Sequence, residues 1–311
     1  MKFLLKRLFG ATIAIVGALT LVFIALRAAP GDPADNILGD EAPETAKVEF
    51  RKRLHLDQPL HVQYGLFWSN VANGTLGTSF EVSDQQKPVS ELIGNVLPAT
   101  IELALAAMLV ALIIALPFGV TAAIHQRKLW DNVSMIIALL GVAMPVFWLG
   151  PMLLYLLTVR YPILPDPGAP LNGVLPLIMP ALVLGAALSA KLTRMVRASV
   201  LDVLREDFTT TARAKGLSEF KVITKHVLRN ALIPVITVMG LQLAALFSGA
   251  IVTEKVFARP GIGTLLLDAI VKRDYAVIQG CVLVVTVGYV VVNLVVDLAY
   301  AAADPRVRKQ S

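Results

Sequence analysis

The 311-residue sequence is poor in cysteine, in charged residues and in aromatic residues. Its single cysteine, Cys281, excludes an internal disulfide and any metal cluster built from cysteines. Charged residues make up 16% of the chain, against about 25% in a soluble domain, so a soluble surface would lack polar cover. The aromatic residues, at 7%, offer no stacking platform for nucleic acid. These shortages exclude a disulfide scaffold and a typical soluble enzyme.

Two motifs of enzyme chemistry are also missing. No histidine is paired with another at metal-ligand spacing, which argues against a metal enzyme. The four scattered histidines are His55, His61, His125 and His226. The chain has no Gly-x4-Gly-Lys-Ser/Thr sequence, so it has no phosphate-binding loop of that type for ATP. We therefore expect no catalytic residues, no metal site and no cofactor on this chain.

Apolar residues are abundant, at 56% of the chain, and the mean hydropathy is +0.71. A helix needs about 20 apolar residues to cross a hydrocarbon core of about 30 Å, and six stretches of the sequence qualify. The first lies between Arg7 and Arg27, the second runs from Leu103 to Ile124 with an entry at Leu97 and Pro98, and the third lies between Asn132 and Arg160. The fourth lies between Asp166 and Lys191, the fifth begins at Ala231 and ends before Glu254, and the sixth lies between Asp274 and Asp297 with an extension to Ala303. The sequence thus predicts an all-α polytopic membrane protein with six transmembrane helices.

The positions of the lysines and arginines predict the orientation, because six spans put both termini on one side. With the termini inside, 17 of the 28 basic residues fall in cytoplasmic segments and five in the short outer loops. We therefore predict cytoplasmic N and C termini, and the net charge of +6 reflects this orientation rather than nucleic-acid binding. The first span is interpreted as retained, because its apolar run of 19 residues is long for a signal peptide and Arg27 stands where a small residue should precede cleavage.

Four parts follow from the spans: an N-terminal helix (1–27), an extracytoplasmic segment (28–96), a core of five helices (97–303) and a cytoplasmic tail (304–311). The second part is predicted to be a small ordered cap, because six of its apolar side chains need burial. These are Leu54, Leu56, Leu60, Tyr64, Phe67 and Trp68. Between the last two spans, the apolar stripe of Leu265, Leu266, Ala269 and Ile270 predicts a short amphipathic helix at the outer interface.

Nine basic residues fall between Lys191 and Arg229, on the cytoplasmic side of the predicted membrane. Pore loops and substrate sites seldom need so many positive charges. An ordinary positive-inside loop is one reading of this segment, since such loops are common. A rigid unit that receives contact from a partner and tilts the adjoining spans is the other reading, and the local pattern favours it.

That local pattern is helix, glycine, helix. A helix is predicted over residues 210–215, with Asp207 or Thr209 as its N-cap, and Gly216 ends it in the left-handed conformation. Ser218 is predicted to cap a second helix that leads into the fifth span. Its shared apolar face is predicted to consist of Phe220, Ile223, Val227 and Leu228.

Polar side chains inside the spans need an explanation of their own. Glu102 and Gln242 are candidates for the translocation path. Near the inner membrane face, Asp297 and Asn293 are predicted to pair with basic residues of the fourth span, namely Lys191, Arg194 and Arg197. A proton relay among such groups would instead indicate a proton-coupled secondary transporter. Those carriers often contain internal repeats, and we find none in this sequence.

Residues 207–217 (DFTTTARAKGL) and 225–235 (KHVLRNALIPV) resemble the "EAA" coupling loop of ABC importer permeases. The resemblance is to the version found in dipeptide, oligopeptide, glutathione and nickel permeases. The stretches 30–33 (PGDP), 97–100 (LPAT) and 273–275 (RDY) agree with this family in the same order along the chain. Thr210 and Thr211 stand where the general loop pattern has Glu and Ala, a departure that is usual in this subfamily.

The resemblance implies the type I ABC importer permease fold, with a coupling loop at about 198–230. The residues it assigns to ATPase coupling are Asp207, Thr210, Thr211, Ala212, Arg213, Ala214, Lys215, Gly216 and Leu217. It implies a second homologous permease, two ATP-binding subunits that carry ATP and Mg, an external solute-binding protein and membrane lipid as partners, in the cytoplasmic (inner) membrane. The implied substrate is a di- or oligopeptide or glutathione. Nickel is the alternative within the family, and a proton-coupled transporter is the alternative class.

Overall fold

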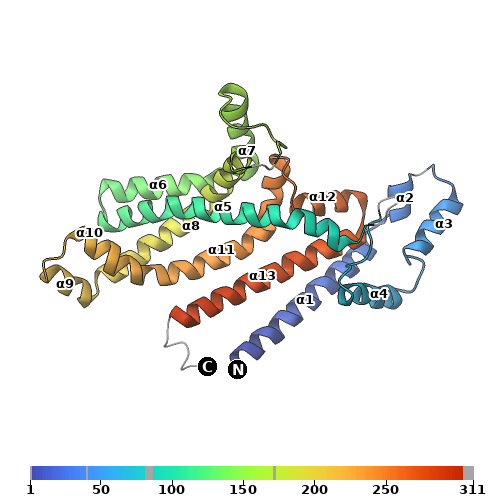
Figure 1. Ribbon diagram of the computed structural model, residues 1–311, viewed down its shortest axis with the longest axis horizontal. Helices are drawn as coiled ribbons and strands as arrows, with labels where there is room; N and C mark the ends of the chain where they lie inside the picture. The colour runs from blue at the N-terminus through green and yellow to red at the C-terminus, as the bar shows by residue number, and fades with distance from the viewer. Residues whose placement is uncertain (1, 40, 81–86, 171–172, 304–311) are drawn as a thin grey trace. The chain divides into compact units, whose positions relative to one another are not determined.

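The computed structural model describes residues 2–39, 41–80, 87–170 and 173–303, and most of this part of the chain is helical. The pairing of Thr78 with Pro88 is an isolated bridge, and the described residues form no strand. Five helices contain apolar stretches long enough to cross a membrane (Figure 1). They are α1 (Lys2–Ala28), α5 (Val89–Ile124), α8 (Leu175–Leu204), α11 (Leu228–Val256) and α13 (Tyr275–Ala303). The prediction of an all-α polytopic membrane protein is confirmed.

The predicted third span is broken instead of continuous. Helix α6 (Leu129–Ala143) is followed by α7 (Val146–Leu154) and the π-helix η1 (Tyr155–Arg160), and the two stretches meet at a bend of 90°. Pro145 lies at the bend, and Met144 before it has an extended ψ of 114°. A proline disfavours helical backbone at the residue that precedes it, so the helix breaks more easily at this point of the apolar run. Counted as one bent span, this pair brings the number to six.

The chain divides into two compact units, both interrupted in sequence. Unit 1 consists of Met1–Thr100 with Pro260–Val290, and unit 2 consists of Ile101–Arg259 with Val291–Ser311. Helices α5 and α13 each contribute residues to both units.

Unit 1 contains α1 and the short helices α2 (Pro33–Leu38), α3 (Glu44–Arg53), α4 (Leu60–Ala72) and α12 (Ile262–Lys272). Five of the six apolar side chains predicted to need burial are buried or partly buried in its apolar clusters. Leu60 is the exception, because it begins α4 and leaves 60% of its surface exposed. The predicted short helix is present as α12, which packs Leu265, Leu266 and Ala269 into the core of unit 1. Ile270 was predicted to share this stripe but is 51% exposed, and Ile262 is buried in its place.

Asp274 connects the loop at residues 79–80 to the start of α13 through hydrogen bonds. Its Oδ2 atom accepts hydrogen bonds from the Ser79 hydroxyl (2.6 Å) and the Phe80 N–H (2.7 Å). Its Oδ1 atom accepts from the Val277 N–H at 3.1 Å, as an N-cap side chain does. Burial raises the pKa of this carboxyl above its usual value, while these hydrogen bonds oppose the rise.

Unit 2 is a bundle in which α5, α8 and α11 share one core, and α6 packs beside α8 (Figure 1). Leu103, Leu192, Val196 and Val235 are fully buried there or nearly so. Helices α5 and α8 approach closely, since a Cβ added at Gly185 would lie 2.7 Å from the Ala107 carbonyl oxygen. Small residues allow such backbone contact between membrane helices, where packing replaces the hydrophobic effect as the driving force.

Candidate functional site

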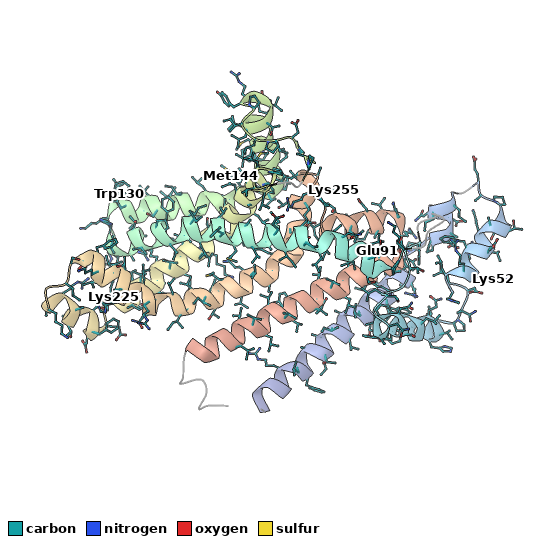
Figure 2. The ribbon with its side chains drawn as sticks, in the orientation of Figure 1. Lys52, Glu91, Trp130, Met144, Lys225 and Lys255 are labelled. Carbon is teal, nitrogen blue, oxygen red and sulfur yellow. The ribbon has the colours of Figure 1, made fainter. Side chains whose placement is uncertain are left out.

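The candidate site is the segment between α8 and α11, formed by α9 (Asp207–Ala214), α10 (Glu219–Lys221) and the π-helix η2 (Val222–Val227). We call residues 205–227 the α9–η2 segment. Figure 2 shows that Lys225 of this segment and Trp130 at the start of α6 lie at one end of unit 2, with Lys255 toward the other end. Trp130 is in the first turn of α6, so the start of α6 lies at the same end of unit 2 as the α9–η2 segment.

Helix α9 is anchored to unit 2 by Thr209 and Ala212, which are both buried. The Thr209 hydroxyl donates a hydrogen bond to the Val203 carbonyl of α8 at 2.9 Å, and Ala212 belongs to the core of unit 2. The helix begins at Asp207, three residues before its predicted start, and its N-cap is Glu206, which makes no side-chain capping bond. The predicted N-cap roles of Asp207 and Thr209 are therefore wrong, because both lie inside the helix and Thr209 is used for packing.

The turn after α9 is a Schellman motif with Gly216 at its left-handed position. Gly216 has a φ of +76°, as predicted from the sequence. Its N–H bonds the Arg213 carbonyl at 2.9 Å, and the Leu217 N–H bonds the Ala212 carbonyl at 3.4 Å. Leu217 and Ala212 both pack on the core of unit 2, which supplies the apolar contact typical of this motif. A Cβ added at Gly216 would meet no atom within 4 Å, so its conformation alone requires glycine.

An ion pair spans this turn. The Arg213 guanidinium donates to the Glu219 carboxylate, with Nη2 to Oε1 at 2.7 Å and Nε to Oε2 at 3.1 Å. The hydrogen bond to Glu219 raises the pKa of Arg213 above its ordinary value. Both side chains are substantially exposed, so we assign the pair a role in fixing the turn geometry and little net stability.

The second half of the segment differs from the predicted amphipathic α-helix. Ser218 is its N-cap residue but makes no side-chain capping bond, and α10 lasts only three residues before η2 begins. Val222 and Val227, five residues apart, are both fully buried, which fits the i to i+5 repeat of a π-helix. Phe220 was predicted to share the inner face, but 76% of its surface is exposed. The prediction assumed a repeat of 3.6 residues, and the π-helix changes the register.

The nine residues predicted for ATPase coupling divide into an exposed set and an inner set. Ala212 is buried and Leu217 is partly buried, so these two serve the packing of the segment. The exposed set consists of Asp207, Thr210, Thr211, Arg213, Ala214, Lys215 and Gly216. Two exposed aromatic side chains of the segment were not among the predicted site residues, Phe208 at 41% and Phe220 at 76% exposed. Phe208 could have been found, because an inner face through Thr209 and Ala212 leaves it facing outward.

An ion pair between a half-buried arginine and a buried carboxylate connects α6 to α8 close to this site. Arg197 donates from Nε to Asp131 Oδ1 and from Nη2 to Asp131 Oδ2, both at 2.7 Å. Asp131 Oδ2 also accepts from the Arg127 backbone N–H at 2.9 Å. Arg197 therefore pairs with Asp131 in the first turn of α6, and the predicted pairing of Asp297 and Asn293 with the basic residues of α8 stays a prediction. The Asp297 side chain lies outside the described residues, and Lys191 and Arg194 are exposed.

The two residues predicted for the translocation path have different surroundings. Glu102, whose side chain is 50% exposed, pairs with Arg259, whose side chain is 3% exposed. Gln242 in α11 is 7% exposed, and its Nε2 atom has no hydrogen-bond partner among the described residues. Within the described residues, no hydrogen bond or common cavity joins Glu102 to Gln242. Their role in a path remains a prediction.

Known proteins resemble this chain over its whole length. Residues 115–309 match the family described as "Binding-protein-dependent transport system inner membrane component", and residues 1–104 match its N-terminal counterpart. The chain is 42% identical over 308 residues to the glutathione transport system permease protein GsiC of Salmonella typhimurium, with 99% of each chain covered. It is 41% identical to GsiC of Escherichia coli strain K12 over the same length and share.

Solved structures agree in fold. An inward-facing structure of the MetNI methionine ABC transporter aligns with a TM-score of 0.59 over 71% of this chain and 100% of the other, at 16% identity. A second crystal form of the same transporter gives a TM-score of 0.56 at 19% identity, again over 71% and 100%. At such identities the likeness shows the fold alone. The family match over residues 115–309 and the full-length relatives show more: the chain belongs to the binding-protein-dependent family of ABC importer permeases.

Proposed function

We propose that this chain is one of two permease subunits of an ATP-driven importer for a peptide-like solute, with glutathione as the first substrate to test. The observation that carries the proposal is the 42% identity to a glutathione permease over 308 residues, with 99% of both chains covered. The multi-pass chain would lie in the cytoplasmic (inner) membrane. Its partners would be a second homologous permease, two ATPases that hold ATP and Mg²⁺, and an external solute-binding protein.

In this proposal the α9–η2 segment receives the movement of an ATPase. Force on α9 would reach α8 through the Thr209–Val203 hydrogen bond and through Ala212. It would reach α11 through Val222 and Val227, because η2 continues directly into that helix. The Arg197–Asp131 pair would then make α6 follow α8. In this arrangement the exposed side of the α9–η2 segment contacts the ATPase, and its buried side transmits the movement to α8 and α11.

Uptake into proteoliposomes tests the proposed function. The complete importer is reconstituted with its binding protein outside and ATP inside, and labelled glutathione, a dipeptide and Ni²⁺ are offered separately. Glutathione or dipeptide accumulation that requires both ATP and the binding protein supports the proposal. Accumulation of Ni²⁺ alone would move the chain to the nickel branch of the family. Uptake driven by a pH gradient without ATP would overturn the mechanism.

Replacing Phe220 by alanine is expected to weaken binding of the ATPase subunits on the order of tenfold to thirtyfold. The reason is that a largely exposed aromatic side chain on a docking surface is a typical hot spot, with an alanine cost of about 1.4–2 kcal/mol. The measurement is titration of purified ATPase onto permease complexes in nanodiscs, read by fluorescence anisotropy. Phe147→Ala is the matched control, because Phe147 is 66% exposed on α7, away from the segment. Equal ATPase affinity of both variants would remove Phe220 from the contact.

A further inference from the structure

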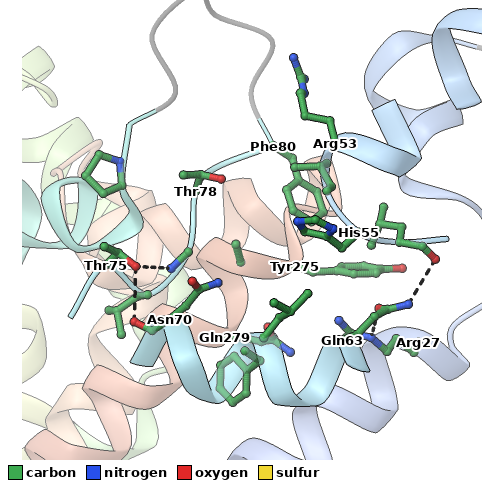
Figure 3. Close-up of a pocket in the computed structure, with 18 residues that line it drawn as sticks. Arg27, Arg53, His55, Gln63, Asn70, Thr75, Thr78, Phe80, Tyr275 and Gln279 are labelled. Atoms are coloured by element: carbon green, nitrogen blue, oxygen red, sulfur yellow. Dashed lines mark hydrogen bonds between the residues drawn. The ribbon is translucent and has the colours of Figure 1, made fainter. Parts of the chain in front are cut away.

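A cavity of about 330 Å³ lies within unit 1, between the ends of several of its helices. Its wall comes from the end of α1, the end of α3 with the loop after it, α4, the loop at 75–80 and the first turns of α13. Figure 3 shows Arg53 and His55 on one side of the Tyr275 ring, and Gln63, Arg27 and Gln279 on the other. The volume falls in the range of small-molecule sites, about 300–1,000 Å³.

The polar side chains of this wall include basic groups and amides that can donate hydrogen bonds. Arg27, Arg53 and His55 contribute the basic groups, and Gln63, Asn70 and Gln279 contribute amides. None of the described residues that line the cavity is aspartate or glutamate. The remaining wall is largely apolar and aromatic, with Phe67, Phe80 and Tyr275 among its members. A wall of this kind suits a small molecule that combines an anionic group with apolar parts.

Arg27 is held in place by the protein. Its Nε atom donates to Gln63 Oε1 at 2.8 Å, and its Nη1 atom donates to the Phe23 carbonyl at 3.3 Å. The guanidinium also stacks on the Phe23 ring, with 3.5 Å between Cζ and the ring centroid. Gln63 is fixed in turn, because its Nε2 atom donates to the carbonyls of Leu56 and Gln58. A preorganised guanidinium of this kind is a good partner for a carboxylate, because little side-chain freedom is lost on binding.

Gln279 supplies an independent sign of a ligand. It is only 4% exposed, it lines the cavity, and its Nε2 atom has no hydrogen-bond partner among the described residues. A buried amide N–H without an acceptor is costly, and buried polar groups of native proteins nearly always have partners. A ligand oxygen in the cavity would supply the acceptor that the protein does not.

We propose that this cavity in unit 1 binds a small solute through a carboxylate group, with Gln279 and Arg27 as donors and Arg53 at the rim. The choice of a peptide-like solute as occupant rests on the proposed function, whereas the preference for a carboxylate rests on the cavity alone. The site belongs to the permease itself and differs from the predicted path residues of unit 2. It would hold solute on the permease independently of the ATPases.

Direct binding to the complete importer tests the site. The complex is held in phosphatidylcholine nanodiscs without ATP and without binding protein, and labelled glutathione is titrated. Saturable binding is expected, and the dimethyl ester of glutathione, which lacks free carboxylates, should bind at least tenfold more weakly. Gln279→Leu should weaken glutathione binding about tenfold or more, because it removes a donor to a charged group. Arg53→Ala, at an exposed position, should weaken binding several-fold without disturbing the fold.

Thr237→Val is the matched control, because it removes a buried hydroxyl without a partner among the described residues, but in α11 of unit 2. It should leave glutathione binding unchanged. Absence of saturable binding, equal binding of the ester, or loss of binding in Gln242→Leu but not in Gln279→Leu or Arg53→Ala would overturn the proposal. If the complex imports glutathione while such a result is obtained, the proposed function stands and only the cavity site falls.

Discussion

Replacing Arg197 by methionine is expected to lower the free energy of unfolding of the permease by about 3–5 kcal/mol. The change leaves Asp131, which is 4% exposed, as a buried carboxylate that has lost both of its guanidinium hydrogen bonds. The hydrogen bond from the Arg127 N–H remains, but it does not replace a positive charge. Thermal unfolding of the complex in detergent, followed by far-ultraviolet circular dichroism, measures the effect.

Two further variants separate this ion pair from a general loss of charge. Arg194→Met removes an exposed arginine from the same helix and should change stability by no more than about 0.5 kcal/mol. Adding Asp131→Asn to Arg197→Met should recover most of the loss, because asparagine is neutral and still accepts from the Arg127 N–H. If Arg194→Met destabilises as much as Arg197→Met, the Asp131 pair is not the cause. The same Arg197→Met complex should also transport poorly, since α6 would no longer follow α8.

The sequence predicted most of this fold because apolar stretches long enough to span a membrane leave helices as the main choice. The positions of α1, α8, α11, α13 and the short helix α12 follow from apolar runs bounded by charges. Gly216 was predictable as well, because a glycine after a short amphipathic stretch is a common helix end. The long start of α5 could not be predicted in the same way, since residues 89–96 are mixed in polarity and join the helix through packing in unit 1.

The features that were not predicted share one physical origin. Each depends on tertiary contacts that decide between local conformations or pairings of similar energy. The π-helix η2 places Val222 and Val227 in the core and turns Phe220 outward, against the α-helical spacing. Asp131 binds Arg197 because α6 packs beside α8, which sequence spacing cannot express. The cavity around Gln279 brings together Arg27 and Gln279, which are 252 positions apart, and no local motif marks it.

Replacing Gly216 by valine is expected to reduce ATP-dependent uptake at least tenfold and to separate ATP hydrolysis from transport. A left-handed conformation at φ +76° costs roughly 1–2 kcal/mol for a residue with a Cβ, and a β-branched residue is worst suited to it. Because a Cβ at this position would meet no atom within 4 Å, the effect comes from the backbone and not from a clash. The turn would relax by losing the hydrogen bonds from Gly216 and Leu217 to carbonyls at the end of α9. Together with the Arg213–Glu219 ion pair across the turn, these bonds fix how α9 leads into α10.

The matched control for this variant is Gly173→Val. Gly173 also has a positive φ, of +92°, and an added Cβ would likewise meet nothing within 4 Å, but it lies in the loop before α8, outside the α9–η2 segment. Similar strain there should leave the ratio of transported solute to hydrolysed ATP unchanged. Gly216→Asn should retain most of the coupling, because asparagine tolerates the left-handed region better than valine does. Normal solute-stimulated ATPase activity in Gly216→Val, or equal loss in Gly173→Val, would show that the left-handed turn does not couple the two reactions. A graded loss from Gly to Asn to Val would show that the backbone conformation at residue 216 holds the ATPase contact in place.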